Sequence, residues 1–311
     1  MIDLSVNISG LRLANPVMPA SGTFAEGLTE VMDVNRLGAF VTKTFTLRPR
    51  SGNPLPRVCE LDSAMLNSIG IPGKGVDHFI QHVVPFWQRY QPPLIVSISA
   101  NTADEFAALA ERLNEVEGIT AIEANISCPN IEADGKAFAI EAGSTARVMR
   151  ALRNATRLPL WAKLTPNTSD IVSVAQAVEN EGGDAIVVGN TLLGMSIDIR
   201  SRRPTLGNIM GGLSGPAIKP IMLRMVYQCH RQVSIPIIGC GGISHAHDVI
   251  EYFYAGASAV QVGTATFIHP RAMITILDDL NEYCRQQGVS HIAQLTGAIV
   301  DDAVTPYSAI Y

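Results

Sequence analysis

Short apolar runs alternate with longer helical patterns along almost the whole chain. Most of the short runs are apolar at consecutive positions, which is typical of parallel strands covered on both faces. They predict eight strands, at residues 17–20, 39–44, 94–99, 121–126, 160–164, 185–189, 235–239 and 258–263. Between them, a spacing of three and four residues predicts helices, most clearly at 102–117, 141–156, 169–182, 216–232 and 245–255.

Eight strand–helix units in 311 residues indicate an α/β protein that forms one (β/α)₈ barrel domain, residues 1–311. A doubly wound sheet is the alternative, but it gives no reason for eight evenly spaced units. Residues 4–13 alternate around Gly10 and predict a small hairpin at the bottom of the barrel. Residues 45–75 are rich in Pro and Gly and predict a long irregular loop after the second strand, over the active-site face.

The composition suits a large buried core, with 47% hydrophobic and 16% charged residues. A net charge of −5 without a basic cluster argues against nucleic acid as a partner. No apolar run approaches the ~18 residues of a membrane span, and the N-terminus lacks the basic and apolar regions of a signal peptide. These features predict a cytoplasmic protein.

The cysteine and histidine spacing predicts no metal held by this chain. The five cysteines (59, 128, 229, 240 and 284) are far apart and include no C-x-x-C pair. Of the seven histidines, His245 and His247 are the pair closest together in the sequence. They flank a predicted helix start after Ser244, so we interpret them as polar residues of a first turn.

In a (β/α)₈ barrel the chemistry lies at the carboxyl ends of the strands. Lys43 and Lys163 lie inside strands that should be buried, and burying an ammonium without an anionic partner is unfavourable by several kcal/mol. Asn125 and Asn190 stand at two other strand ends. Together these side chains predict a pocket for a flat, polar, anionic ligand.

A cysteine follows the fourth predicted strand, in the sequence Asn125-Ile-Ser-Cys-Pro-Asn130. Because Pro129 cannot continue a strand, Cys128 is expected in a loop at the strand end. Its thiol would be within reach of a ligand bound there. The alternative is a small buried core residue, which is the usual environment of a free cysteine.

Glycines at the last two strand ends predict a phosphate site. Gly241 and Gly242 follow the seventh strand, and Gly263-Thr264 follows the eighth. Glycines let backbone N–H groups approach an anion closely, and this part of the barrel commonly binds phosphate. Gly215, before Pro216 and the sixth helix, is equally compatible with a turn and with a ligand contact.

Several motifs resemble those of class 1 dihydroorotate dehydrogenases, from about residue 3 to about residue 290. They are Ala20-Ser-Gly-Thr-Phe, Lys43-Thr, Gly52-Asn-Pro-Leu-Pro-Arg57, Met65-Leu-Asn-Ser-Ile-Gly70, Glu123-Ala-Asn-Ile-Ser-Cys-Pro-Asn130, Lys163-Leu-Thr-Pro-Asn167, Asn190-Thr-Leu-Leu-Gly194, Gly211-Gly-Leu-Ser-Gly-Pro-Ala-Ile-Lys-Pro220 and Ile238-Gly-Cys-Gly-Gly-Ile243. Segments 65–70, 190–194 and 211–220 resemble the class 1B catalytic subunit, whereas the fumarate-linked class 1A enzyme differs most there.

The resemblance implies FMN-dependent oxidation of (S)-dihydroorotate to orotate in de novo pyrimidine biosynthesis. It implies that Cys128 is the base at C5 while hydride leaves C6 for the flavin. The implied substrate-binding residues are Lys43, Asn67, Ser68, Ile69, Gly70, Ile71, Asn125, Asn190 and Thr191. The implied FMN-binding residues are Ser21, Lys43, Thr44, Ser97, Asn125, Lys163, Gly189, Gly215, Gly241, Gly242, Gly263 and Thr264. At position 97, serine replaces an asparagine usual in the family, and its side chain has a shorter reach toward the flavin.

For class 1B, the resemblance further implies a partner subunit that carries FAD and a [2Fe–2S] cluster and passes electrons to NAD. The implied assembly is a heterotetramer of two plus two chains built on a catalytic homodimer. Three alternatives stay open: a class 1A-like fumarate-linked enzyme, a flavin-free barrel isomerase or lyase for a phosphorylated metabolite, and a non-catalytic barrel subunit. The set of Cys128, Lys43 and Asn125 argues against the last.

Overall fold

Eight parallel strands form the centre of the computed structural model, which describes residues 2–127 and 137–301. They are β3 (Val17–Pro19), β4 (Phe40–Val41), β7 (Leu94–Ile98), β8 (Ile119–Asn125), β9 (Leu160–Lys163), β10 (Ala185–Val188), β15 (Ile237–Cys240) and β16 (Ala259–Val262). Every strand residue except Thr120 is buried, as expected for strands covered on both faces. All eight predicted strands are confirmed, although the second is shorter than predicted.

The strand order β3-β16-β15-β10-β9-β8-β7-β4 is that of a barrel. The two end strands, β3 and β4, are joined by a hydrogen bond just before β4, in which the Gly38 N–H donates to the Val17 carbonyl oxygen over 2.9 Å. Each strand pair is parallel, so all eight carboxyl ends meet at one end of the barrel. The predicted (β/α)₈ fold is therefore confirmed.

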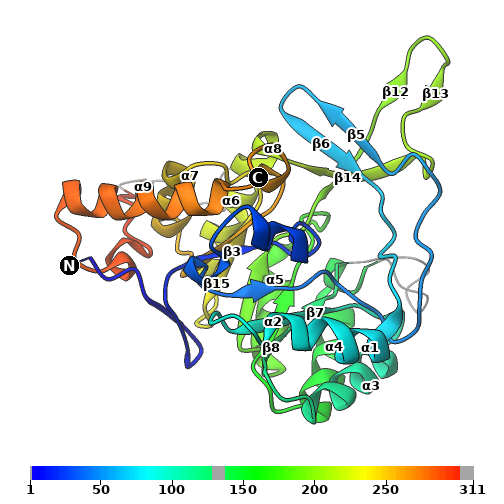
Figure 1. Cartoon of the computed structure of the whole chain (residues 1–311), viewed down its shortest axis with the longest axis horizontal. Helices are drawn as coiled ribbons and strands as arrows, with labels where there is room; N and C mark the ends of the chain where they lie inside the picture. Colours follow the sequence, from blue (N-terminus) through cyan, green and yellow to red (C-terminus); the bar gives the residue numbers. More distant parts are fainter. Residues whose placement is uncertain (1, 128–136, 302–311) are drawn as a thin grey trace.

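Helices surround the barrel, with α1–α4 on one side and α6, α7 and α9 on the other (Figure 1). The five predicted helices are confirmed as α3 (Ala103–Asn114), α4 (Ala142–Ala155), α5 (Ile171–Asn180), α6 (Lys219–His230) and α7 (Ala246–Tyr254). Further helical segments are η1 (Glu26–Glu30), η2 (Val34–Arg36), α1 (Gly75–His78), η3 (Phe79–Val83), α2 (Val84–Trp87), η4 (Phe138–Ile140), η5 (Pro216–Ile218), α8 (Ala265–Ile268), α9 (Ala272–Gln287) and η6 (Ile292–Leu295). His245 caps α7 and His247 lies in its first turn, as expected.

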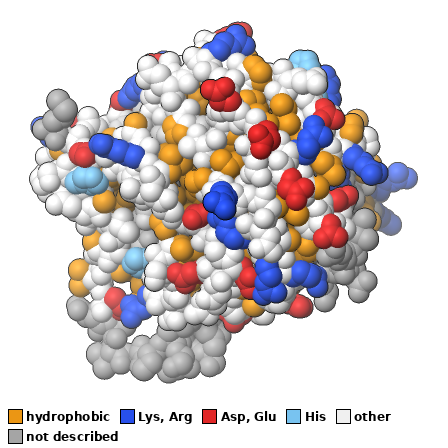
Figure 2. Space-filling model, turned by 90° about the horizontal axis from the view of Figure 1, so that it is seen from below, with side chains coloured by type: hydrophobic (Ala, Val, Ile, Leu, Met, Phe, Trp, Pro, Cys, Tyr) orange, Lys and Arg blue, Asp and Glu red, His pale blue; other side chains and the backbone are white. Residues whose placement is uncertain are grey.

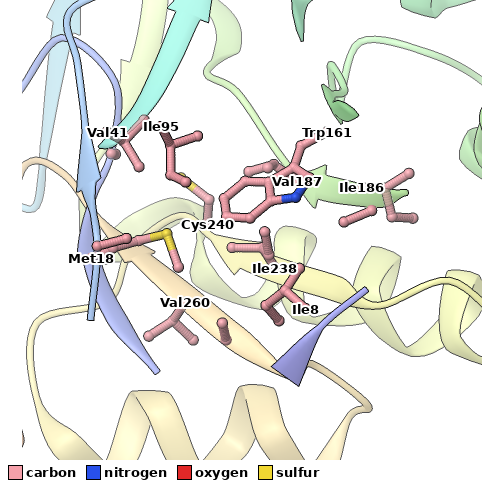
Figure 3. Close-up of a cluster of buried hydrophobic side chains, with 14 of the residues drawn as sticks. Ile8, Met18, Val41, Ile95, Trp161, Ile186, Val187, Ile238, Cys240 and Val260 are labelled. Carbon is pink, nitrogen blue, oxygen red and sulfur yellow. The ribbon is translucent and has the colours of Figure 1, made fainter. Parts of the chain in front are cut away.

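The predicted N-terminal hairpin consists of β1 (Val6–Ile8) and β2 (Leu11–Leu13), which pair antiparallel across a turn at Ser9 and Gly10. Its apolar residues Ile8 and Leu13 are fully buried. Figure 3 shows Ile8 within the same apolar cluster as Ile238 and Trp161 of the barrel strands. The hairpin therefore contributes directly to the barrel core.

A second sheet stands beyond the strand ends, in a region predicted to be irregular. The 45–75 segment contains β5 (Val58–Leu61) and β6 (Ala64–Asn67), which join β14 (Met210–Ser214) and β11 (Leu192–Met195) in the order β11-β14-β6-β5. A short ribbon, β12 (Ile197–Asp198) with β13 (Arg203–Pro204), extends from it. Both hairpins project at the upper right of Figure 1. The prediction of irregular structure was wrong here because β6 pairs with a strand far away in the sequence.

The surface carries charges of both signs. Figure 2 shows one face on which Lys, Arg, Asp and Glu are interspersed around hydrophobic side chains, without a block of one sign. Within residues 2–127 and 137–301, the helices are all too short or too polar to span a bilayer.

Candidate active site

Lys163 is the last residue of β9, and it is buried with only 3% of its surface exposed. Its Nζ donates to Gln261 Oε1 over 2.9 Å and to Ser21 Oγ over 3.3 Å. The nearest carboxylate oxygen, Glu123 Oε1, is 4.0 Å away. The prediction that Lys163 lies inside a buried strand is confirmed, and its ammonium lies at the carboxyl end of the barrel.

Lys43 does not lie inside a buried strand as predicted, because β4 ends at Val41 and the Lys43 side chain is exposed. Its Nζ donates to the Pro72 carbonyl oxygen over 2.8 Å. Although solvent reaches it, surrounding protein atoms lower its pKa below the ordinary value of 10.5 by desolvation, and the charge of Arg57 lowers it further. Lys43 therefore lies against the end of the predicted substrate-binding segment 67–71.

Asn125 and Asn190 meet between the ends of β8 and β10. Asn190 Nδ2 donates to Ser127 Oγ over 2.5 Å and to Asn125 Oδ1 over 3.4 Å, and the Ser127 hydroxyl also donates to Asn125 Oδ1. The Thr191 N–H donates to Asn190 Oδ1 over 2.8 Å, which fixes that amide. The structure thus brings together the two strand-end asparagines that the sequence singled out.

Cys128, the predicted base, lies outside the described residues, which end at Ser127 in this loop and resume at Ala137. The preceding residue, Ser127, is held in place by hydrogen bonds with both asparagines. The assignment of Cys128 stays a prediction.

The 67–71 segment is tied to the second sheet rather than to the barrel. Asn67 Nδ2 donates to the Gly212 carbonyl oxygen over 3.4 Å, and the Ser68 hydroxyl accepts from Asn53 Nδ2 over 2.7 Å. The Ile69 carbonyl oxygen accepts from the Asn53 N–H. The backbone then turns at Gly70 and Ile71, whose φ angles are +76° and +50°. Gly212, which pairs with Asn67, also lies close to Thr191, because a Cβ added to Gly212 would be 2.0 Å from Thr191 Oγ1. The sheet therefore links 67–71 to Thr191.

The predicted phosphate cradle is a cluster of glycines beside the start of α6. Gly241 and Gly242 follow β15 with φ angles of +136° and +70°, in the region that favours glycine. A Cβ added to Gly242 would lie 2.9 Å from Lys219 N and 3.0 Å from the Gly215 carbonyl oxygen. Gly215 therefore belongs to this cluster.

The remaining cradle residues come from the ends of β10, β14 and β16. The Gly189 N–H donates to the Cys240 carbonyl oxygen over 2.9 Å, and the Thr264 hydroxyl donates to Ser214 Oγ over 2.8 Å. A Cβ added to Gly263 would lie 3.4 Å from Cβ of Ala20, the neighbour of Ser21. All the predicted glycine positions thus lie where strands end.

Ser97 is fully buried, so it lies beneath the strand-end surface instead of on it. Its hydroxyl is 2.9 Å from Thr44 Oγ1 and donates to Glu123 Oε1 over 3.1 Å. Both oxygens of the pair are thus used inside the protein, and Thr44 is itself only 7% exposed.

Sequence reasoning missed Glu123 and Gln261, which are both fully buried and support Lys163. The signal was present, because a glutamate interrupts the apolar strand Ala121-Ile-Glu-Ala and a glutamine interrupts Ala259-Val-Gln-Val. A polar residue inside such a strand requires a partner in the barrel interior. Only the strand register shows which residues meet.

The donor set fits the flavin mononucleotide that the resemblance implies. The glycine cluster offers backbone N–H groups that suit a phosphate, and Lys163 places a buried cation at the same end of the barrel. Thr266, three residues after Gly263, has a buried hydroxyl without a hydrogen-bond partner among the described residues. By contrast, within those residues, groups of three or more His, Cys, Asp or Glu suited to a metal ion are absent.

Comparison with known proteins identifies the family. The family model described as dihydroorotate dehydrogenase matches residues 3–284. Proteins named dihydroorotate dehydrogenase B (NAD(+)), catalytic subunit, are similar over 96% of this chain: those of Desulforamulus reducens (50% identical, 98% of its length), Pelobacter propionicus (48%, 98%) and Porphyromonas gingivalis (46%, 99%). These matches confirm the resemblance seen in the sequence. The chain belongs to the dihydroorotate dehydrogenase family.

Proposed function

We propose that this chain is the catalytic subunit of an NAD-linked dihydroorotate dehydrogenase, which oxidises (S)-dihydroorotate to orotate in de novo pyrimidine biosynthesis. One observation carries the proposal: in a barrel of this family, Lys163, the asparagine pair and the glycine cluster lie at the same end. A cytoplasmic location follows from that pathway and suits the four described cysteines, which are all free thiols.

The glycine cluster would hold the phosphate of FMN, with backbone N–H groups of Gly241, Gly242, Gly263 and Thr264. The ring and ribityl chain of FMN would be lined by Lys43, Lys163, Ser21, Thr44, Asn125, Gly189 and Gly215. Ser97, which lies beneath them, would act through its hydrogen bond with Thr44. FMN, when bound, supplies the hydride acceptor. Lys163 would stabilise negative charge near it, which is a common way for a protein to tune a flavin.

The substrate would lie between the asparagine pair and Lys43. Orotate is planar and carries a carboxylate and amide-like edges, which match the amides of Asn67, Asn125 and Asn190 and the ammonium of Lys43. Thr191 and the 68–71 segment would complete its surroundings. Cys128 would hold the proton removed from C5, and its thiol is usable as a base if nearby cations lower its pKa.

The test is flavin reduction by dihydroorotate under anaerobic conditions. The purified chain should be yellow with bound FMN and should bleach when dihydroorotate is added. Cys128→Ala should keep FMN but slow this bleaching by at least ~100-fold, the usual scale for loss of a general base. Cys59→Ala, in β5 of the second sheet, is the matched control and should bleach normally. A colourless chain would favour the flavin-free isomerase or lyase, and normal bleaching in Cys128→Ala would reject this base.

A further inference from the structure

A fully buried carboxylate lies under the candidate active site. Glu123 stands in the middle of β8, and no part of its surface is exposed. A carboxylate can only accept hydrogen bonds, so every group that contacts it must donate. Two chains of hydrogen bonds end on its two oxygens, and each of them leads to a residue proposed to touch a ligand.

The first chain leads to the buried lysine. Gln261 Nε2 donates to Glu123 Oε2 over 2.5 Å, so the carbonyl oxygen of the Gln261 amide must face away from the carboxylate. That oxygen accepts from Lys163 Nζ over 2.9 Å. Glu123 thus determines that Lys163 meets an acceptor and not the amide NH₂ group, and it adds a negative charge 4.0 Å from the ammonium.

The second chain leads to the asparagine pair. Ser97 Oγ donates to Glu123 Oε1 over 3.1 Å, so the Thr44 hydroxyl must donate to Ser97 across their 2.9 Å contact. Thr44 Oγ1 is then free to accept from Asn125 Nδ2, 3.5 Å away. With its NH₂ group on Thr44, Asn125 turns its carbonyl oxygen to the outer side, where Ser127 and Asn190 donate to it.

We propose that Glu123 is a positioning residue, which sets the orientation of Lys163 toward the flavin and of the Asn125 amide toward the substrate without touching either ligand. The proposal rests on the proposed function. Glu123→Gln keeps the shape of the side chain but replaces one acceptor by a donor. If the new NH₂ faces Gln261, that amide must turn its own NH₂ toward Lys163; if it faces Ser97, the donor direction through Thr44 must reverse. In either case one of the two hydrogen-bond chains cannot keep its order of donors and acceptors, and Lys163 loses the negative charge beside it.

Two measurements on the FMN-loaded chain test this. The first is orotate affinity of the oxidised protein, followed by the flavin absorbance change; Glu123→Gln should weaken it by ~10-fold, the scale of one hydrogen bond to a charged group. The second is the shift in flavin midpoint potential caused by Lys163→Met. That shift should be much smaller in the Glu123→Gln background, because the lysine is no longer held in place.

Variants that break only one of the two hydrogen-bond chains test each of them separately. They also keep the proposal testable if the Glu123→Gln protein fails to fold. Gln261→Leu should change the potential but leave orotate affinity near its original value, whereas Ser97→Ala should weaken orotate binding. Glu123→Asp retains an acceptor-only group and should recover part of the orotate affinity. Unchanged orotate affinity together with equal Lys163→Met shifts in both backgrounds would overturn the proposal alone. An unmodified chain that binds neither FMN nor orotate would overturn the proposed function, and this inference with it.

Discussion

Among single residues, Lys43 is the titratable group that we propose to contact the anionic substrate. Desolvation and Arg57 lower its pKa below 10.5, so the folded chain binds fewer protons than the unfolded chain in the window between the lowered pKa and 10.5. Through this group the free energy of unfolding rises with pH across that window, since the unfolded state there binds more protons. An anionic ligand reverses the preference, because it favours the charged ammonium.

We therefore expect orotate affinity to fall as the pH rises through the lowered pKa of Lys43, starting below the ordinary value of 10.5. Orotate titrations of the oxidised protein between about pH 7 and about pH 10 measure this. Lys43→Gln should bind orotate more weakly at neutral pH and should lack the alkaline decline. The same decline in the variant would assign it to a different group.

Some of the candidate site residues could be predicted from the sequence, and others could not. Lys163 and Asn125 could be predicted as site residues because a polar residue at a strand end of a barrel faces the open end. The residues that support Lys163 could not be predicted, because Glu123 and Gln261 are 138 positions apart and are brought together only by the register of the barrel strands. Lys43 was misplaced because the apolar run 39–44 gives no sign that pairing stops at Val41.

At the scale of elements, the strands and helices of the barrel were predictable because their signals are local. The α5 helix begins where Asp170 accepts from the Ser173 N–H over 3.0 Å, and it buries Ile171, Val174, Ala175 and Val178 as the spacing indicates. The second sheet was not predictable in this way. Its strand β6 pairs with β14, about 150 residues later, and its residues alternate too weakly to mark a strand.

Contact between a strand and its helix gives a prediction at this scale. A Cβ added to Gly239 of β15 would lie 2.4 Å from Cδ1 of the buried Tyr252 ring in α7, whose hydroxyl donates to the Gly241 carbonyl oxygen over 2.7 Å. Gly239→Ala should lower the free energy of unfolding by ~1–3 kcal/mol through overpacking. It should also weaken FMN binding, because a displaced ring no longer holds the Gly241 carbonyl.

The matched control is Gly143→Ala in the first turn of α4, where an added Cβ meets nothing within 4 Å. This substitution should raise the free energy of unfolding by ~0.4–1 kcal/mol, because alanine reduces the freedom of the unfolded chain. Chemical denaturation of both variants and a titration with FMN measure the effects. A Gly239→Ala protein as stable as the unmodified chain would show that α7 moves aside at little cost.

In the whole molecule, closure of eight parallel strands gathers their carboxyl ends, and the proposed ligand contacts that they carry, at one end of the barrel. This much follows from counting strand–helix units in the sequence. No G-x-G-x-x-G motif follows a strand and opens a helix, so a nicotinamide site of the Rossmann type is not expected, and the five dispersed cysteines do not suit an iron–sulfur cluster.

The similar proteins are nevertheless named as NAD(+) enzymes and as catalytic subunits, which presupposes another subunit. We therefore expect the purified chain to reduce NAD slowly or not at all with dihydroorotate, and to reduce it rapidly once a partner carrying FAD and a [2Fe–2S] cluster is added. The two should co-elute as a heterotetramer of two plus two chains. Mixing them and following NADH absorbance and elution volume tests both expectations. Rapid turnover with fumarate alone, without a complex, would instead identify an enzyme of the class 1A type, because fumarate would then take electrons directly at this barrel.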